Sequence, residues 1–197
     1  NWISLAACRA PTLQWTGQTQ TTLRVAGGWV RDKLLGKSSS DIDIAIDNQT
    51  GVAFATSLNE YLQSIGIPNH RLAVIMANPE QSKHMETATL KVLGLPIDFV
   101  NLRSESYTDE SRVPEIRFGT AAEDAFRRDF TINTLFYNIN TSQVEDLTNR
   151  GISDLISGVI RTPLDPFVTF RDDPLRILRG VRFAARFNFA LDASLVQ

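Results

Sequence analysis

The segment that most constrains the fold reads as a strand, a double-glycine turn, a helix and a second strand. Residues 23–26 and 41–46 carry the strand-like patterns, and Trp29–Leu35 carries the helical one. Because side chains two residues apart on a strand point to the same face, Asp41 and Asp43 project together. The segment therefore predicts an α/β fold with two carboxylates side by side.

The two carboxylates and the glycine turn indicate one kind of chemistry. Adjacent carboxylates repel each other unless a cation lies between them, and Mg²⁺ commonly takes one or two carboxylates together with substrate phosphates. Gly27 and Gly28 let a phosphate approach the backbone, and the start of a helix favours an anion. An ordinary turn and a polar strand face explain each feature alone, but their combination favours a nucleotide-handling site.

The stretch LRVAGGWVRDKLLGKSSSDIDIAID resembles motif A of the polymerase-β-like nucleotidyltransferase superfamily. Its GGxVRD and DxD elements resemble the class II branch, which contains tRNA nucleotidyltransferases (CCA-adding enzymes) and poly(A) polymerases. The resemblance implies that Asp41 and Asp43 are catalytic and hold Mg²⁺, and that Asp32 orients Arg31. It also implies that the nucleotide triphosphate is bound by Gly27, Gly28 and Arg31.

The amino-acid composition limits the number of domains and the kinds of site that this chain can form. The 197 residues, 43% of them hydrophobic, suffice for one domain, or for one domain and the start of another. The formal net charge of −2 predicts no overall basic surface, so any RNA contact must be local or lie in missing sequence. Cys8 is the only cysteine, which excludes an intrachain disulfide and a cysteine-based zinc site. Without a recognisable membrane span or secretion signal, an intracellular protein is expected.

The rest of the chain predicts a small sheet flanked by helices, followed by a helical region. Residues 104–119 have no apolar period and predict a mobile loop, and 149–158 is rich in turn residues. The chain starts at Asn1 and stops soon after its last predicted helix, so we expect it to be the N-terminal part of a longer protein. The other expected elements are helices at 52–63, 120–137 and from Pro174 to the end, a strand at 71–77, and a β-hairpin of 85–92 with 96–103.

A third acidic residue, Asp98, lies in the apolar strand IDFVNLR. A carboxylate in such a strand is costly unless it is paired or bound to a metal. Asp98 is therefore a candidate third metal ligand beside Asp41 and Asp43, as the resemblance to class II enzymes also implies. A position at the edge of the sheet, or an ion pair with Arg103, is the alternative.

Two arginines precede an aspartate in EDAFRRDFTINTLFYN. Arg127 and Arg128 can clamp phosphates as planar forks, and Asp129 can accept hydrogen bonds from ribose hydroxyls. Taken alone, the segment is better explained as a surface helix with the i,i+4 pairs Glu123–Arg127 or Asp124–Arg128. However, RRDFTIN resembles motif B of class II enzymes, which implies that Arg128 and Asp129 hold the ribose.

The stretch DLTNRGISDLISG resembles motif C of the same family. The resemblance implies a hinge between the catalytic head and the next domain, with Gly151 as its flexible point. A polar loop with turn glycines is equally consistent with these residues. By resemblance, residues 1–160 form the catalytic head and residues 161–197 begin a helical neck.

The segment RDDPLRILRGVRFAARFNF predicts an amphipathic helix. Asp173 is a suitable N-cap, and Pro174 suits the first turn. The pattern predicts an exposed arginine stripe and a buried apolar stripe on roughly opposite faces. The arginines are Arg176, Arg179, Arg182 and Arg186, and the apolar residues are Ile177, Leu178, Val181, Ala184 and Ala185.

The residues DDPLR within this segment resemble motif D, usually written EDxxR. The resemblance implies that Asp173 and Arg176 act as a protein template for the incoming base, and that Arg179 contacts phosphate or positions Asp173. Cytosine and adenine present an amino donor beside a ring-nitrogen acceptor, which suits a carboxylate next to a guanidinium. Uracil and guanine present the reverse order and leave buried groups unpaired. Asp172 replaces the usual glutamate and keeps its charge.

Motifs A to D follow in order over Leu23–Phe189, and the segments between them resemble eukaryotic, fungal-like CCA-adding enzymes. The implied protein has a polymerase-β-like head and adds CCA to tRNA 3′ ends from CTP and ATP, with Mg²⁺, in the cytoplasm, nucleus or mitochondrion. The alternatives are enzymes that add only CC or only A, a poly(A) polymerase, and a non-catalytic RNA-binding module.

Overall fold

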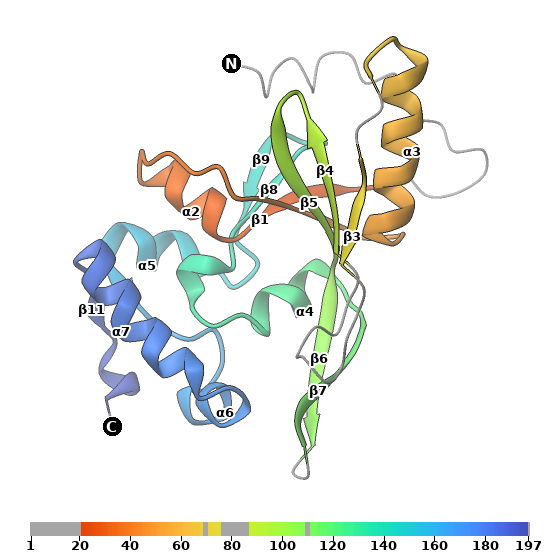
Figure 1. Ribbon diagram of the computed structural model, residues 1–197. Helices are drawn as coiled ribbons and strands as arrows, with labels where there is room; N and C mark the ends of the chain where they lie inside the picture. Colours follow the sequence, from red (N-terminus) through yellow and green to blue (C-terminus); the bar gives the residue numbers. More distant parts are fainter. Residues whose placement is uncertain (1–20, 69–70, 76–86, 109–110, 197) are drawn as a thin grey trace.

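The computed structural model describes residues 21–68, 71–75, 87–108 and 111–196. A seven-stranded sheet forms its centre, with strands in the order β3-β4-β5-β2-β1-β8-β9 (Figure 1). Strands β2 and β5 run parallel, and the other neighbouring pairs of this sheet are antiparallel, so the expected mixed sheet is confirmed. The strands are β1 (Leu23–Ala26), β2 (Ile42–Ile46), β3 (Ala73–Ile75), β4 (Thr87–Val92), β5 (Leu95–Asn101), β8 (Phe136–Asn138) and β9 (Gln143–Glu145).

The first half of the chain follows the sequence prediction closely. Helix α2 (Gly28–Leu34) connects β1 to β2, and α3 (Gly51–Ser64) follows with Thr50 as its N-cap. The expected hairpin is β4 and β5, which join at Leu93 and Gly94, both with positive φ. Strand β3 lies within the expected strand, and the predicted residues 76–77 and 85–86 lie outside the described residues.

The sheet and the helices share a core built from distant parts of the sequence. Phe99 of β5 is 1% exposed and packs against Phe54 of α3, with ring centroids 5.4 Å apart. Phe130 and Phe136 are fully buried. Figure 1 shows α3 at one end of the sheet and the helices α2, α5 (Gly151–Ser157) and α7 (Leu175–Phe187) at the other.

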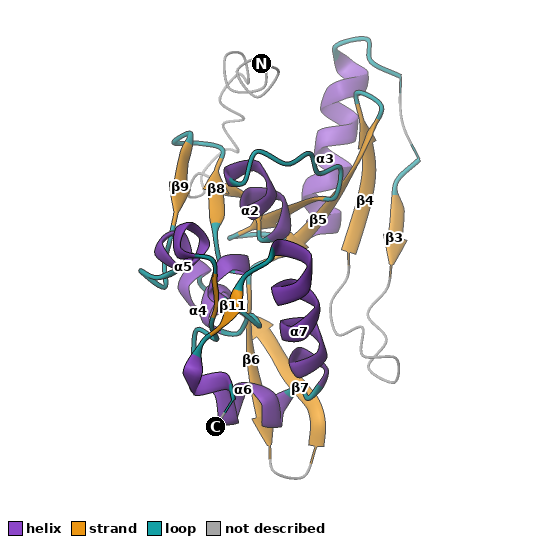
Figure 2. Cartoon of the chain, turned by 90° about the vertical axis from the view of Figure 1, so that its left-hand side faces the viewer, coloured by secondary structure: helices purple, strands orange, loops and turns teal. Residues whose placement is uncertain are grey.

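The mobile loop predicted over residues 104–119 is wrong, because a β-ribbon occupies this segment. Strand β6 (Arg103–Thr108) pairs antiparallel with β7 (Ser111–Phe118) in a separate two-stranded sheet that projects from the fold (Figure 2). The residues of β6 that line a cleft are charged or polar, Glu105 and Tyr107 among them. A search for apolar periodicity misses such a strand, since ion pairs rather than apolar contacts cover its inner face.

The helix predicted over residues 120–137 is only partly correct. It divides into α4 (Ala121–Phe126), the 3₁₀ turn η2 (Thr131–Asn133) and strand β8. Thr120 starts α4 with a capping box. The helix does not continue to residue 137 because β8 pairs with the edge of β1, which satisfies its backbone and buries Phe136.

The segment 149–158, expected to be rich in turns, contains α5 and ends at Gly158 in the left-handed conformation. A polar loop is therefore wrong here. Gly151 begins α5 and is buried, and a Cβ on it would lie 2.7 Å from the carbonyl oxygen of Thr131. Glycine is required there for close packing, and its role as a hinge stays a prediction.

The last part of the chain contains more separate helices and strands than the sequence predicted. Helix α6 (Pro166–Asp172) precedes α7 and was not predicted. Helix α7 does not run to the end of the chain, because Asn188 adopts a left-handed φ of 58° and terminates it. The remaining elements are β10 (Val159–Ile160), which pairs parallel with β11 (Ala190–Leu191), and the 3₁₀ turn η3 (Ala193–Leu195).

Helix α7 does not bury the stripe that the sequence predicted. Ile177, Leu178 and Val181 are 49%, 68% and 55% exposed. Its opposite side packs on Phe130, so closely that a Cβ on Gly180 would lie 2.9 Å from that ring. The residues that α7 buries are Gly180, Phe183 and Phe187. Among the helices in the described part of the chain, none is long and apolar enough to cross a membrane.

Candidate active site

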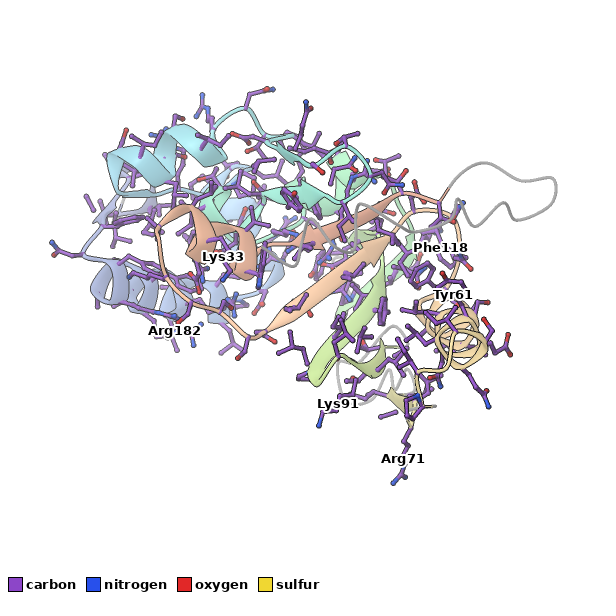
Figure 3. All side chains as sticks on the ribbon, turned by 90° about the horizontal axis from the view of Figure 1, so that it is seen from above. Lys33, Tyr61, Arg71, Lys91, Phe118 and Arg182 are labelled. Atoms are coloured by element: carbon purple, nitrogen blue, oxygen red, sulfur yellow. The ribbon has the colours of Figure 1, made fainter. Side chains whose placement is uncertain are left out.

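A cleft of about 1090 Å³ brings together most of the predicted site residues. Its walls come from β1, α2, β2, β5, the β6–β7 ribbon, α4 and α7, among other segments. Arg182 of α7 also lines it, at the opposite end of the molecule from Tyr61 and Arg71 (Figure 3). Gly27 and Asp98 are not among the lining residues. The predicted residues that line it are Gly28, Arg31, Asp41, Asp43, Arg128, Asp129, Asp173, Arg176 and Arg179.

The carboxylates of Asp41 and Asp43 lie on the cleft surface at the start of β2. Burial, together with the negative charges of Asp41 and Asp98, raises the pKa of Asp43 to about 6, while Arg128 acts in the opposite direction. The group therefore carries negative charge that its surroundings do not fully compensate. Such a set of carboxylate oxygens fits a hard divalent cation.

Asp98 lies next to Asp43 across the parallel β2–β5 pair, in the interior of the sheet. Its Oδ1 accepts a hydrogen bond from the hydroxyl of Thr89 at 2.5 Å, whereas Arg103 pairs with Glu105. Both alternatives, an edge position and an ion pair with Arg103, are therefore wrong. Within the described ranges, no three or more His, Cys, Asp or Glu side chains are grouped closely enough to hold a metal ion. The role of Asp98 as a third metal ligand therefore stays a prediction.

The geometry of the turn requires glycine at Gly27. Its φ is +60°, which other residues rarely adopt, and a Cβ there would lie 2.7 Å from Nη1 of Arg128. The N–H of Gly27 donates to the carbonyl oxygen of Leu135 at 2.9 Å. At Gly28 a Cβ would meet only the guanidinium of Arg31, at 3.5 Å or more. The protein's own packing therefore does not require Gly28, whose backbone lines the cleft.

Arg31 is 4% exposed and connects α2 to α7. Its Nε donates to Oδ1 of Asp32 at 2.8 Å, and its Nη1 donates to the side-chain carbonyl of Asn133. The guanidinium carbon lies 4.7 Å from the ring centre of Phe187 and 5.3 Å from that of Phe183. The expected contact between Asp32 and Arg31 is thus present.

The buried carboxylate of Asp124 holds both arginines of the RRD sequence. Its Oδ1 accepts from Nη2 of Arg127 at 2.5 Å, and its Oδ2 accepts from Nη2 of Arg128 at 2.7 Å. Burial alone raises the pKa of Asp124, but the two guanidinium groups hold it below its ordinary value. The alternative i,i+4 pair Asp124–Arg128 is therefore present, but it lines the cleft instead of an outer surface. Glu123 instead accepts a hydrogen bond from the backbone N–H of Thr120 at the start of α4.

Asp129 connects the segment after α4 to α7. Its Oδ2 accepts from Nη2 of Arg179 at 2.6 Å and from its Nε at 2.7 Å. Its Oδ1 accepts from the backbone N–H of Phe130 at 2.8 Å and from the side-chain amide of Asn133 at 2.9 Å. The carboxylate is thus held rigidly at the wall of the cleft.

Asp173 and Arg176 lie next to each other where α6 meets α7. The Oδ1 of Asp173 accepts from the N–H of Leu175 at 3.0 Å. The N-cap predicted at Asp173 is nevertheless wrong, because α6 extends to Asp172 with Asp173 as its C-cap, and the N-cap of α7 is Pro174. Its Oδ2 lies 3.8 Å from Nε of Arg176, and Nη2 of Arg176 lies 3.9 Å from Oε2 of Glu105. A carboxylate and a guanidinium therefore stand side by side on the cleft wall.

Sequence reasoning missed several residues of the cleft. Glu105 and Tyr107 were assigned to a loop, and Asn133 was given no role, although all three line the cleft. The alternation of Arg103, Glu105 and Tyr107 is the signal that could have revealed a strand with a polar inner face. Arg186, expected to be solvent-exposed, also lines the cleft, and its Nη2 lies 3.7 Å from Oδ2 of Asp32.

Residues 23–161 match the family model described as the poly A polymerase head domain. The match covers most of the chain, which therefore belongs to this family, and the family predicted from motifs A to D is confirmed. Nucleotidyltransferases of this family generally use a divalent metal ion.

Two curated relatives with more than 55% identity carry the same name. The mitochondrial CCA tRNA nucleotidyltransferase of Saccharomyces cerevisiae is 58% identical over 179 residues, covering 89% of this chain and 33% of the relative. That of Candida glabrata is 56% identical over 185 residues, covering 92% and 35%. Poly(A) polymerase I of Salmonella typhi is 34% identical over 175 residues, covering 88% and 36%. The chain spans about a third of the length of these relatives.

Solved structures share the fold. A CCA-adding enzyme in an apo form matches with a TM-score of 0.74 and 34% identity, covering 88% of this chain and 38% of that one. A tRNA nucleotidyltransferase complexed with a primer tRNA and an incoming ATP analogue matches with a TM-score of 0.66 and 32% identity, covering 89% and 45%. The predicted polymerase-β-like head is therefore confirmed.

Proposed function

We propose that this protein is a tRNA nucleotidyltransferase that adds C, C and A to the 3′ end of tRNA from CTP and ATP, without a nucleic-acid template. The observation that carries the proposal is the meeting in one cleft of the carboxylates Asp41 and Asp43 with the pair Asp173 and Arg176. The 58% identity to a relative named CCA tRNA nucleotidyltransferase supports the same reaction.

The proposed reaction is an in-line transfer, in which the 3′-oxygen of the tRNA attacks the α-phosphorus and pyrophosphate leaves. Mg²⁺ held by Asp41 and Asp43 would activate the 3′-hydroxyl and neutralise charge on the leaving group. Burial and the neighbouring carboxylates of Asp41 and Asp98, which together raise the pKa of Asp43, support a cation at this position. Gly28 and Arg31 line the neighbouring wall, where the triphosphate would lie, and Gly27 shapes that wall by admitting Arg128.

We assign the ribose to Arg128 and Asp129, since both line the cleft and are held firmly. Asp124 fixes the guanidinium of Arg128, and Arg179 fixes the carboxylate of Asp129. A carboxylate that can accept from the 2′-hydroxyl favours ribonucleotides over deoxyribonucleotides, which lack that donor. Arg179 would thereby position Asp129 rather than Asp173.

We assign the choice of base to Asp173 and Arg176. A carboxylate that accepts from an amino group, beside a guanidinium that donates to a ring nitrogen, matches the Watson–Crick edge of cytosine and of adenine. The two groups are 3.8 Å apart and line the cleft together, which supports the pairing. Uracil and guanine would leave both partners unpaired, at a cost of about 1–3 kcal/mol for the buried Arg176 and less for the partly exposed Asp173.

The test is extension of a tRNA that lacks its CCA end by the full-length protein with Mg²⁺. Each nucleotide is offered alone, and then CTP and ATP together. Three added residues that need both nucleotides support the proposal. A long A tail indicates a poly(A) polymerase, and CC alone or A alone indicates a split activity. Binding of tRNA without incorporation indicates a non-catalytic module, against which the presence of both Asp41 and Asp43 argues.

We also propose that residues 1–160 belong to the catalytic head and that residues 161–197 begin a helical neck. The end of the family match at residue 161 supports this boundary. The names of the Saccharomyces and Candida relatives include the word mitochondrial, which supports an intracellular location that includes the mitochondrion. Imaging of the full-length protein with a C-terminal fluorescent tag tests the compartment.

A further inference from the structure

The β6–β7 ribbon inserts one carboxylate, that of Glu105, among three arginines from different elements. Its Oε1 lies 3.1 Å from Nε of Arg103 and 3.0 Å from Nη1 of Arg127, and its Oε2 lies 3.9 Å from Nη2 of Arg176. The Glu105 side chain is only 6% exposed. A buried carboxylate with this many cationic neighbours is fixed in position, because any movement would separate several ion pairs at once.

Arg176 depends on this carboxylate more than on its neighbour in sequence. Its side chain is 12% exposed, and its guanidinium lies between Asp173 at 3.8 Å and Glu105 at 3.9 Å. The Asp173 side chain is 41% exposed, so solvent screens it more than it screens Glu105. Both separations are too long for a direct hydrogen bond, so these two carboxylates of the described part of the chain leave the donors of Arg176 available to a ligand in the cleft.

Tyr107 supports Glu105 from the same face of β6. Its hydroxyl donates to Oε2 of Glu105 at 3.1 Å, which is the oxygen that faces Arg176. Burial and the negative charge of Glu105 together raise the pKa of Tyr107 to about 12, so the hydroxyl stays protonated and continues to donate. The tyrosine therefore holds Oε2 in the direction of the guanidinium.

We propose that Glu105 is a positioning residue for base selection, acting through Arg176. It sets where the guanidinium stands relative to Asp173, and so which base edge the pair accepts. Because Glu105 also pairs with Arg127, and Arg127 shares Asp124 with Arg128, one chain of alternating charges joins the base-reading side of the cleft to its ribose side. The inference rests on the proposed function and adds to it a residue that the ribbon supplies.

The test uses the full-length protein and compares Glu105→Gln with Glu115→Gln. Glu115 lies on the same ribbon, but its side chain is 65% exposed and pairs with Arg117, which is itself 77% exposed. The measured quantity is the ratio of kcat/KM for CTP to that for UTP, and for ATP to that for GTP, on tRNA primers. We expect both ratios to fall about tenfold in Glu105→Gln, and to stay within twofold of wild type in Glu115→Gln.

Two further variants separate positioning from folding. Tyr107→Phe removes one hydrogen bond to Glu105 and should lower the same ratios by a smaller factor, so it tests the idea even if Glu105→Gln fails to fold. In an Arg176→Ala background, Glu105→Gln should cause no further loss of discrimination, because its effect passes through the guanidinium. Additive losses in the double variant, or unchanged ratios in folded Glu105→Gln, overturn the proposal. Absence of CCA addition by the wild-type protein would instead overturn the proposed function.

Discussion

Arg179 of α7 and Asp129 of the segment after α4 form a two-pronged ion pair, with Nη2 and Nε of the arginine 2.6 and 2.7 Å from one carboxylate oxygen. The two residues are 50 positions apart in the sequence. Asp129 is 7% exposed, whereas the Arg179 side chain is 46% exposed. A residue of the helix thus fixes a carboxylate on the wall of the cleft.

This ion pair predicts the effect of Arg179→Met, which keeps the length of the side chain and removes its charge. With Asp129 less firmly held, kcat/KM for CTP and for ATP should fall together by about tenfold, which corresponds to about 1.4 kcal/mol. The preference for CTP over UTP should not change, since the base-reading pair is untouched. Steady-state kinetics of the full-length protein measure both, with Lys91→Met, on the exposed part of β4, as control. A loss confined to one nucleotide would contradict this assignment.

The carboxylate pair predicts that Asp41→Ala abolishes nucleotide incorporation and leaves the fold intact. Asp41 is exposed, so its removal leaves no buried partner unpaired, and the melting temperature should stay within a few degrees of wild type. Primer extension and thermal melting are measured on the same preparation. Near-normal extension by a folded Asp41→Ala protein would refute the metal assignment.

The neighbouring side chains of Asp173 and Arg176 predict that their substitution changes nucleotide choice. Asp173→Asn replaces a carboxylate that only accepts by an amide that can also donate, so UTP and GTP should be excluded less strictly. We expect the discrimination ratios to fall by about tenfold or more. Competition between labelled nucleotides measures them, with Glu60→Gln on the exposed side of α3 as control. Equal loss of every nucleotide, with selectivity unchanged, would rule out the template role.

The buried carboxylate of Asp124 predicts a pH-dependent stability. Its pKa is held below the ordinary value of 3.8, so its contribution to stability is complete above that pH and is lost as the pH falls through the lower, folded-state pKa. Asp124→Asn should therefore lower the free energy of unfolding by about 3 kcal/mol at neutral pH, because it leaves Arg128 without its carboxylate and Arg127 with Glu105 alone. The difference from wild type should shrink below about pH 4. Urea unfolding at several pH values measures it, and a pH-independent difference would disprove the linkage.

Local spacing explains why so much of the site could be predicted. The succession of strand, glycine turn, helix and strand around Gly27 is determined by neighbouring residues. Strand alternation alone brings Asp41 and Asp43 to one side. The contact between Asp32 and Arg31 is also local. These predictions succeeded because the interacting groups are within a few residues of each other.

The secondary-structure prediction failed where polar side chains, rather than apolar ones, cover the inner face of a strand. The strand that carries Glu105 has no apolar stripe, because its inner face is covered by arginines from α4 and α7. The side chains of Arg179 and Asp129 could not be paired from sequence, since nothing local relates them. The one weak sequence indication of a strand here was the alternation of Glu105 with Arg103 and Tyr107.

By itself, the sequence determined the family, the order of the motifs and the local geometry of the aspartate pair. Only the tertiary structure decided which face of α7 is buried, because a helical period defines two faces but not the surface that one of them meets. Here Phe130 approaches Gly180, so the arginine side turns toward the cleft and leaves Ile177 and Leu178 exposed. The cleft, and the arginines that converge on Glu105 and Asp129 within it, are consequences of that packing.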